Sequence, residues 1–249
     1  MIDKSLYVAM TGASASLRAQ ASVAQNLANA DTVGFQQQLV ATKAMPITGE
    51  GLASRVNTAP VMAGVSAAPG QLINTGNDLD VALHQDRWLA VQAPDGSTAY
   101  TRAGDLKLTA NGLLTTAGGL PVLDAGGAPL SIPPYQTMSI ASDGTISIVP
   151  QGQPASTITE SGRLQVVAAR TADLVRGDDG LMRAKPGAEA PPQAAGPALT
   201  PGAVEGSNVE ATSMLVSMIQ YARQFEMQVR VLQSGDENAR SGNSLLSSK

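Results

Sequence analysis

The single histidine of the chain, His84, stands close in the sequence to the carboxylates of Asp80 and Asp86. A histidine beside carboxylates could act as a general acid or base, or could bind a metal ion. A Ser-His-Asp triad would have to use the same residue, because the chain has no second histidine. A lone histidine among polar neighbours is more often a surface or hydrogen-bonding residue, so we expect no catalytic role for His84.

Other motifs that carry chemistry are incomplete or missing. The run Gly177-Asp178-Asp179-Gly180 resembles part of a calcium-binding loop, but the remaining EF-hand ligands are missing and a β-turn is the better interpretation. The chain has no cysteine, which excludes disulfides, thiol nucleophiles and cysteine-based metal sites. It has no Gly-x-x-x-x-Gly-Lys-Ser/Thr or Gly-x-Ser-x-Gly motif, and its scattered carboxylates suggest no glycosidase pair. We therefore predict that the chain is not an enzyme and has no catalytic, metal-binding or cofactor-binding residues.

The charge of the chain argues against nucleic acid and membranes as partners. Among 249 residues, 16 are basic and 20 are acidic, and no cluster of Lys and Arg marks a face for binding phosphates. No apolar run approaches the roughly 18 residues that would span a bilayer. The N-terminal stretch, with Asp3 beside Lys4, does not resemble a secretory signal peptide. If the protein leaves the cytoplasm, we expect it to do so without a cleavable leader.

Residues 4–29 are predicted to form an amphipathic helix. Apolar side chains recur at alternating intervals of four and three residues, which is the heptad pattern of a helix-packing seam. Gly12 weakens this helix by about 1 kcal/mol relative to Ala. The seam consists of Leu6, Met10, Ala13, Leu17, Gln20, Ala24 and Leu27.

A second amphipathic helix is predicted over residues 209–235, with a possible continuation to about Leu246. Ser207 or Asn208 could cap its start, and Glu210 would then stand in the first turn, where the helix dipole favours an acid. The seam of this helix follows the same four-three rule and is entirely apolar. It consists of Ala211, Leu215, Met218, Ala222, Phe225, Val229 and Leu232.

Between the two helices, residues 71–185 are predicted to form an all-β domain of antiparallel hairpins. Short runs rich in Val, Ile, Leu, Thr and Tyr alternate with pairs of turn residues. Asn-Gly and Asp-Gly pairs provide the positive φ angles that tight hairpins need. The turn signals are Asp95-Gly96, Asn111-Gly112, Gly118-Gly119, Gly126-Gly127 and Asp143-Gly144.

Two stretches poor in large apolar residues, 36–70 and 186–204, are predicted to be linkers, the first of them extended. The sequence thus predicts an α+β fold in which two coiled-coil-like helical regions, residues 1–35 and 205–249, flank the β domain. Because both seams lie near the termini and are separated from that domain, we expect them to be buried against neighbouring copies or related subunits. The pattern alone allows equally that the helices pack on the chain's own core.

The residues at the end of the first helix resemble the signature of flagellar rod and hook proteins. That signature reads Asn-Asn-Leu-Ala-Asn, two residues, Thr, one residue and Gly-Phe. We expect Gly34 to adopt a backbone conformation closed to other residues, and Phe35 to anchor the turn by burial. Gln25 replaces the first Asn, and Gln36 stands where a Lys or Arg is common. The matching segment is Gln25-Asn26-Leu27-Ala28-Asn29-Ala30-Asp31-Thr32-Val33-Gly34-Phe35.

The resemblance continues in the right order over nearly the whole chain. Distal rod and hook proteins usually have a Gly-containing turn at the place where this chain has His84-Gln85-Asp86. This difference favours the proximal rod type. The chain length favours the same type, and so does the segment Arg223-Gln224-Phe225-Glu226-Met227-Gln228. Further matching segments are Pro69-Gly70-Gln71-Leu72, Leu79-Asp80-Val81-Ala82-Leu83, Trp88-Leu89-Ala90-Val91-Gln92, Tyr100-Thr101-Arg102-Ala103-Gly104, Gly119-Leu120-Pro121-Val122-Leu123 and Glu205-Gly206-Ser207-Asn208-Val209.

The resemblance implies a structural subunit of the flagellar basal-body rod. It implies export through the flagellar type III apparatus, unfolded and without a cleaved signal peptide, and assembly in the periplasm with copies of itself and other rod proteins around the export channel. The rod would transmit motor torque to the hook and filament, with no cofactor and no nucleic acid or inserted membrane segment. The assembly interface would comprise the apolar residues of both seams together with Asn29, Gly34 and Phe35.

Other functions remain open at this point. The chain could be a distal rod protein of the same family, or a secreted β-domain binding module whose end helices oligomerise it. An enzyme with an unrecognised site would need a concave pocket with converging polar groups, which the sequence does not suggest.

Overall fold

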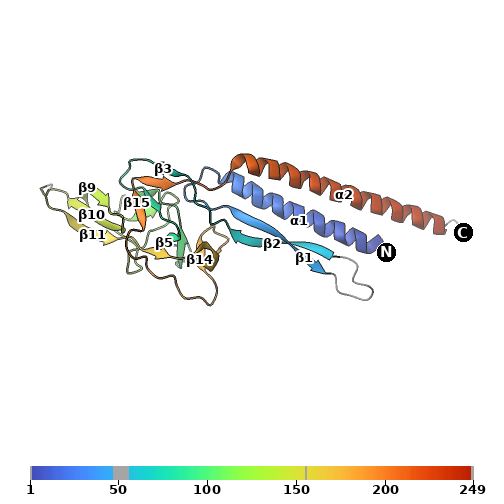
Figure 1. Cartoon of the computed structure of the whole chain (residues 1–249), viewed down its shortest axis with the longest axis horizontal. Coiled ribbons are helices and arrows are strands. Elements are labelled where there is room, and N and C mark those ends of the chain that lie inside the picture. The colour runs from blue at the N-terminus through green and yellow to red at the C-terminus, as the bar shows by residue number, and fades with distance from the viewer. Residues whose placement is uncertain (1, 47–55, 155, 248–249) are drawn as a thin grey trace. The chain divides into compact units, whose positions relative to one another are not determined.

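The computed structural model describes residues 2–46, 56–154 and 156–247. Two long helices, α1 (Ile2–Ala28) and α2 (Ala211–Ser247), are the first and last elements of the chain, and the segments between them form short strands (Figure 1). This arrangement confirms the α+β fold class that the sequence predicts. The bounds of α1 agree with the prediction to within two residues, and α2 includes the predicted continuation.

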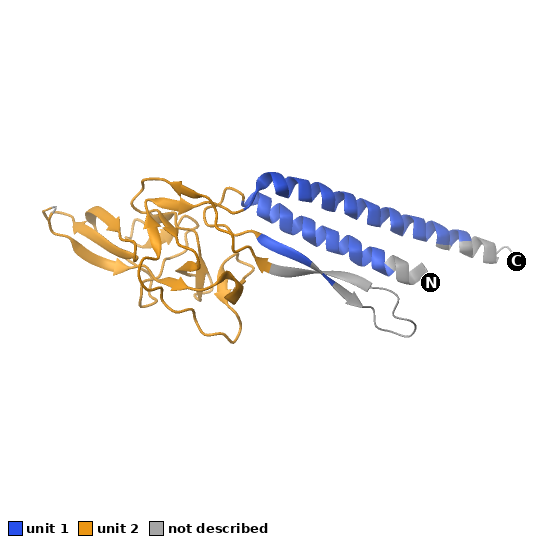
Figure 2. Cartoon of the chain, viewed as in Figure 1, with its two compact units in different colours: residues 1–29, 38–63, 209–249 blue, residues 30–37, 64–208 orange. Residues whose placement is uncertain are grey.

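The chain folds into two compact units (Figure 2). Unit 1 contains residues 1–29, 38–63 and 209–249, and unit 2 contains residues 30–37 and 64–208. The chain therefore passes between the units at four places, after residues 29, 37, 63 and 208. Both ends of the chain belong to unit 1, so every covalent connection of unit 2 runs through one of these four links.

The helices of unit 1 pack side by side in opposite directions (Figure 1). The amide nitrogen of Asn26, near the end of α1, lies 4.0 Å from the sulfur of Met214, near the start of α2. Gly12, earlier in α1, lies against the side chain of Gln228, later in α2. The end of α1 therefore lies beside the start of α2, and an earlier part of α1 lies beside a later part of α2, so the two helices are antiparallel.

Small side chains on α1 allow this close packing, because a helix surface without bulky groups lets a second helix approach. A Cβ added to Gly12 would lie only 3.0 Å from the Gln228 amide group. The atoms that lie this close belong to the flexible end of the Gln228 side chain, so Gly12 marks the contact between the helices but is not strictly required by it. The other small buried residues of α1 are Ala9, Ala13, Ser16, Ala19 and Ser22.

Strands β1 (Gln38–Pro46) and β2 (Val56–Val65) form a two-stranded sheet. The side-chain oxygen of Asn26 accepts a hydrogen bond from the Gln38 N–H, and its amide donates to the Gln38 carbonyl, both at 2.9 Å. We expected an extended linker over residues 36–70, but the structure places these two strands within it. Residues 36–70 show no sustained two-residue apolar period, so the sequence gives no strand signal here.

Unit 2 consists of short strands that pair antiparallel in several small sheets. The largest sheet has the order β12-β5-β6-β14-β13, and a second has the order β11-β10-β9. Three further pairs are β15-β4, β16-β3 and β7-β8. The bounds are β3 (Leu72–Asn74), β4 (Val81–Leu83), β5 (Arg87–Gln92), β6 (Thr98–Thr101), β7 (Leu106–Leu108), β8 (Leu114–Thr116), β9 (Tyr135–Ile140), β10 (Thr145–Pro150), β11 (Thr159–Arg163), β12 (Val166–Ala168), a 3-10 turn η1 (Thr171–Asp173), β13 (Leu174–Arg176), β14 (Met182–Ala184), β15 (Leu199–Pro201) and β16 (Ala203–Glu205).

Glycine turns join successive strands of unit 2 at the positions that the sequence predicts. Gly96 lies between β5 and β6, Gly112 between β7 and β8, and Gly144 between β9 and β10, with φ angles of 81°, 78° and 90°. Residues with a Cβ rarely adopt these angles. The Asp-Gly and Asn-Gly pairs therefore located these hairpins correctly.

The core of unit 2 consists mainly of aliphatic side chains, together with Met138, Met182, Tyr100 and the buried Trp88. The segment 186–204, which we expected to be a linker, contributes Ala198 and Leu199 to this core and pairs β15 with β4. A three-residue strand among Pro, Ala and Gly is too short to produce a recognisable pattern. The largest fully buried apolar side chains are Trp88, Leu89, Leu106, Leu114, Ile146, Leu164 and Leu199.

Candidate functional site

The members of the predicted seam of α1 differ in their exposure. Met10 and Leu17 are exposed over 60% and 48% of their surfaces, and Ala24 is exposed as well. Ala13 is buried and Leu27 is half-buried. Leu6 belongs to α1, but its side chain lies outside those that the structure describes.

The predicted seam of α2 lies mostly on the side that faces α1. Phe225 is one turn from Gln228 and about three turns from Met214, and both of these residues contact α1. Ala211 and Leu215, by contrast, are exposed. The half-buried members of the seam are Met218, Ala222, Phe225, Val229 and Leu232.

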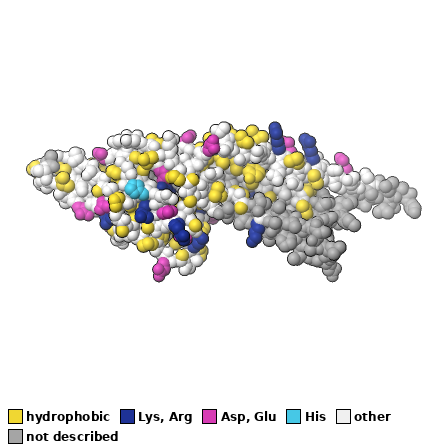
Figure 3. All heavy atoms as spheres, viewed as in Figure 1, with side chains coloured by type: hydrophobic (Ala, Val, Ile, Leu, Met, Phe, Trp, Pro, Cys, Tyr) yellow, Lys and Arg dark blue, Asp and Glu magenta, His cyan; other side chains and the backbone are white. Residues whose placement is uncertain are grey.

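Both helices of unit 1 also carry exposed apolar side chains, several of which the predicted seams did not include. The exposed side of α1 is almost uncharged, since Arg18 is the only charged residue between Tyr7 and Ala28. Figure 3 shows part of this surface, where hydrophobic side chains are interspersed with few charged ones. We call this set the outer helix residues: Tyr7, Met10, Leu17, Leu215, Val216, Ile219, Met227 and Val231.

The signature segment that follows α1 belongs to unit 2 and is held tightly there. Gly34 has a φ of 67°, the left-handed conformation that the sequence predicts. Its N–H donates to the carbonyl of Glu205 at 2.7 Å, and a Cβ at this position would collide with the backbone of Arg102 and Ala103. Phe35 is 7% exposed, as expected of a buried anchor. Glycine is therefore needed at position 34 both for its conformation and for the close approach of the segment that follows β6.

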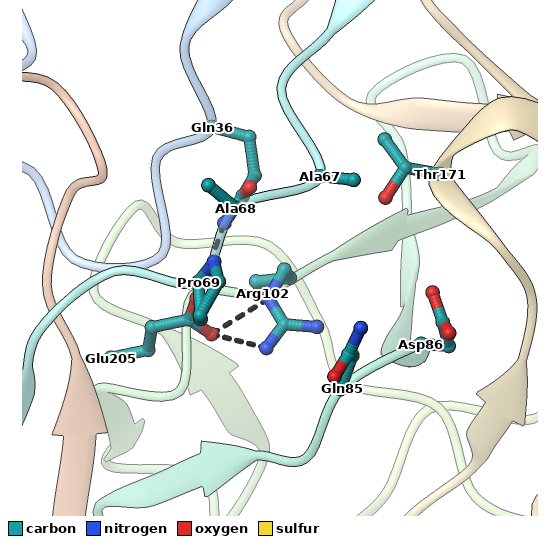
Figure 4. A pocket seen from close by; sticks show the side chains of 9 residues that line it. All are labelled: Gln36, Ala67, Ala68, Pro69, Gln85, Asp86, Arg102, Thr171 and Glu205. Carbon is teal, nitrogen blue, oxygen red and sulfur yellow. Dashed lines mark hydrogen bonds and ion pairs between the residues drawn. The ribbon is translucent and has the colours of Figure 1, made fainter.

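A buried ion pair lies beside this segment. The guanidinium of Arg102 and the carboxylate of Glu205 are in contact, and both side chains are less than 10% exposed (Figure 4). The Nε of Arg102 donates to Glu205 at 2.7 Å, and its terminal nitrogens also donate to the carbonyls of Leu83, His84 and Arg87. Because a buried guanidinium is costly unless its five N–H groups have partners, this arrangement is well satisfied.

The second carboxylate oxygen of Glu205 binds two other chain segments. It accepts a hydrogen bond from the Gly70 N–H at 2.9 Å and from the Gln36 amide at 3.3 Å. Gln36 and Phe35 are in turn held by Arg176, which donates to the Gln36 carbonyl at 3.0 Å and lies 4.6 Å from the centre of the Phe35 ring. Burial lowers the pKa of Arg176, and these two contacts offset part of that desolvation.

Asn208 binds the same segments from the other side. Its side-chain oxygen accepts from the Gln37 N–H at 2.6 Å, and its amide donates to the Gln36 side-chain oxygen at 3.0 Å and the Ala68 carbonyl at 2.7 Å. The sequence predicts that Ser207 or Asn208 caps α2, with Glu210 in the first turn. Instead Asn208 makes these tertiary contacts, and Glu210 immediately precedes the helix.

We define the junction cluster as Gln36, Arg102, Arg176, Glu205 and Asn208, all in unit 2. None of these was predicted as a site residue, although Arg102, Glu205 and Asn208 stand inside segments that match the family. Asn26 was missed in the same way and holds β1 in unit 1. Asn29, which was predicted, makes a local bond from its amide to the Gln25 carbonyl.

A small cavity of about 10 Å³ lies beside the junction cluster (Figure 4). Its lining includes Gln85, Asp86 and Thr171 in addition to Gln36, Arg102 and Glu205. A volume of this size holds about one water molecule. Asp86 has a φ of 55°, so the turn at this position does require the left-handed conformation that a glycine would adopt freely.

The other residues that could do chemistry have structural partners. The His84 ring lies 3.1 Å from the Thr200 hydroxyl, whereas the Asp80 carboxylate binds Thr75 and Asn77. The run from Gly177 to Gly180 is a turn between β13 and β14, closed by a hydrogen bond between those two glycines. Within the described part of the chain, no three His, Cys, Asp or Glu side chains gather as metal ligands would.

Comparison with known proteins agrees with the sequence signature. Three family models match: "Flagella basal body rod protein" over residues 6–36, "Flagellar hook protein FlgE/F/G D1 domain" over 82–148 and "Flagellar basal body rod FlgEFG protein C-terminal" over 200–245. The FlgF rod proteins of Escherichia coli K12 and Salmonella typhimurium LT2 are 43% and 44% identical to the chain, over 99% of both proteins in each case. The chain belongs to the FlgF family of flagellar basal-body rod proteins.

Rod proteins of the FlgG type are also similar to the chain. The FlgG rod protein of Agrobacterium fabrum is 30% identical over 95% of this chain and 97% of its own length, below the 43% of the Escherichia coli FlgF protein. The protein is thus a structural component of the flagellar basal body that assembles with other rod proteins. Among the described residues, no helix is both long and apolar enough to cross a membrane.

Proposed function

We propose that this FlgF-type chain is a subunit of the proximal rod. In this proposal its terminal helices pack against copies of itself and against other rod proteins around the export channel. The assembled rod then transmits torque from the motor to the hook and filament. The chain acts as a mechanical part and catalyses no reaction.

The outer helix residues carry this proposal. Tyr7, Met10 and Leu17 expose large apolar surfaces on a nearly uncharged helix, and Met227 and Val231 do so on α2. Each such side chain contributes roughly 1.5–3 kcal/mol when it becomes fully buried. Several of them buried together in every subunit would give a stiff, cohesive assembly.

Assembly in the basal-body rod also requires a route out of the cytoplasm. A rod protein must reach the periplasm, and we propose that this chain is exported unfolded through the flagellar type III apparatus without losing a signal peptide. Mass spectrometry of the mature protein in purified basal bodies tests this step. A mature N-terminus at Met1 or Ile2 supports the proposal, and a shortened N-terminus contradicts it.

The interface itself can be tested with one matched pair of variants. Leu17→Glu places a charge among the outer helix residues, whereas Gln25→Glu places the same charge at an exposed polar position of α1. We expect Leu17→Glu to be absent from purified hook–basal bodies and to abolish swimming, and Gln25→Glu to assemble normally. Both purified monomers should retain the unmodified protein's circular dichroism, which shows that folding is unaffected.

Three outcomes would contradict the proposal. Normal assembly of Leu17→Glu would exclude this helix face as the interface. An amount of the unmodified chain equal to that of the distal rod protein would reassign it to the distal rod. A stable closed oligomer in dilute solution, with no copy in basal bodies, would favour the secreted binding module.

A further inference from the structure

Several hydrogen bonds inside unit 2 lie beside the places where the chain passes between the units. The chain leaves unit 2 after residue 37 and after residue 208, and re-enters it at residue 64. Asn208, the last residue of unit 2, binds both of the other segments: its side chain contacts Gln37 and Gln36 on one side and Ala68 on the other. Its backbone N–H also donates to the Phe35 carbonyl at 3.3 Å.

Glu205 ties the same three segments together a second time. Its two carboxylate oxygens bind Gln36, Gly70 and Arg102, and its backbone carbonyl binds the Gly34 N–H. Arg102 follows β6, a strand of the largest sheet. The three segments are therefore attached to one another and, through Arg102, to the core of unit 2.

A force that pulls on any one of these segments is shared by the others. A single hydrogen bond contributes little to stability, but several bonds stretched at the same time must break together, whereas isolated bonds break one after another. Without cross-links, each segment would peel away from unit 2 separately. The hydrogen bonds of Asn208 and Glu205 prevent this because they join the segments directly beside the points where the chain leaves the unit.

We propose that the junction cluster is a mechanical clamp through which load passes between the entering chain segments and the core of unit 2, with Asn208 as its positioning residue. This proposal rests on the function proposed above, since it concerns a rod under torque. It predicts that loosening the clamp leaves assembly intact and impairs only the transmission of large loads.

Asn208→Asp is the sharpest test, because it changes one group. The amide donors that bind Gln36 and Ala68 become carboxylate oxygens, and these face acceptor oxygens instead. Asn111→Asp makes the same change at an exposed turn position and serves as the control. Asn208→Ala removes the hydrogen bonds without adding charge and serves as the second variant if the aspartate disrupts folding.

Hydrogen exchange on the purified full-length protein measures the clamp itself. We expect amide exchange over residues 34–37 and 66–70 to accelerate about tenfold or more in both Asn208 variants, because two or more hydrogen bonds are lost. The β10 amides and the Asn111→Asp protein should exchange as in the unmodified protein. Unchanged exchange at residues 34–37 would show that Asn208 does not hold this segment and would overturn the proposal.

Swimming speed under increasing viscosity then tests how well the rod transmits large loads. We expect the Asn208 variants to appear in hook–basal bodies at normal amounts and to swim normally in dilute medium, but to lose swimming speed faster than the Asn111→Asp strain as viscosity rises. Equal speeds of the Asn208 variants and the Asn111→Asp strain at every viscosity would overturn the clamp proposal. Absence of the Asn208 variants from the basal body would also overturn it, because the cluster would then serve assembly. Absence of the unmodified chain from basal bodies would instead refute the proposed function.

Discussion

Arg102 and Glu205 stand 103 residues apart in the chain and form an ion pair whose side chains are only 7% and 4% exposed. Removing one partner of such a pair leaves an uncompensated buried charge, which typically costs about 3–5 kcal/mol. We therefore expect Glu205→Gln to lower the free energy of unfolding of unit 2 by about that amount. The single tryptophan, Trp88, is a built-in probe, since the Arg102 guanidinium lies 5.6 Å from its ring.

Urea unfolding followed by Trp88 fluorescence checks this prediction. Asp173→Asn is the matched control, because Asp173 pairs with Arg170 at an exposed site where an ion pair contributes little. Replacing both members of the buried pair with apolar residues should restore part of the loss, since no charge is then left unpaired. Equal midpoints for Glu205→Gln and Asp173→Asn would show that the buried pair is dispensable.

Gly34 and Gly96 separate two reasons for needing glycine. Both have positive φ angles, of 67° and 81°, but a Cβ at Gly34 would collide with the Arg102 backbone, whereas nothing lies near a Cβ at Gly96. Alanine at either position costs roughly 1–2 kcal/mol for its conformation. We expect Gly34→Ala to cost clearly more than Gly96→Ala in the same unfolding experiment. Equal costs would mean that the backbone beside Gly34 can move aside.

The hairpins of unit 2 could be predicted from the sequence because their signals are local. An Asn-Gly or Asp-Gly pair fixes a turn through the backbone angles of its own residues, whatever the rest of the chain does. The helices were predictable for a similar reason, since their period is contained in about 25 residues. Strand β15 was missed because its partner, β4, is distant in the sequence. Strand β1, which pairs with β2, was missed because residues 36–70 show no sustained two-residue apolar period.

The side of α1 that packs against α2 could not be predicted from its heptad pattern. Ala and Ser residues of α1 occur on every side of the helix, so the polarity of the side chains does not distinguish one side from another. What selects the buried side is small volume, as at Gly12 and Ala13, and not the apolar bulk of Met10 and Leu17. The junction cluster was likewise hidden, because its residues come from four distant segments and only the folded chain brings them together.

Gly12 gives a direct test of the helix pair in unit 1. Alanine here should be tolerated, because the nearest atoms belong to the flexible end of Gln228 and because alanine favours the helix by about 1 kcal/mol. Leucine should reduce helix stability by roughly 1–3 kcal/mol, since it cannot fit without separating α1 from α2. Ser14→Leu adds the same side chain at an exposed position. In urea unfolding followed by circular dichroism, Gly12→Leu should lose its helices at a lower urea concentration than Ser14→Leu. The reverse order would contradict this packing.

The helix content of unit 1 should depend on assembly. Helices in proteins gain most of their stability from packing an apolar face, and α1 and α2 leave large apolar residues such as Met10 and Met227 exposed when paired only with each other. We therefore expect dilute monomer to show less helix than the 27 residues of α1 and 37 residues of α2 together, and to gain helix as it assembles. Circular dichroism across a concentration series measures this change, with Leu17→Glu as the variant that should not gain helix. A dilute monomer that already has its full helix content would show that the helices order before they meet a neighbour.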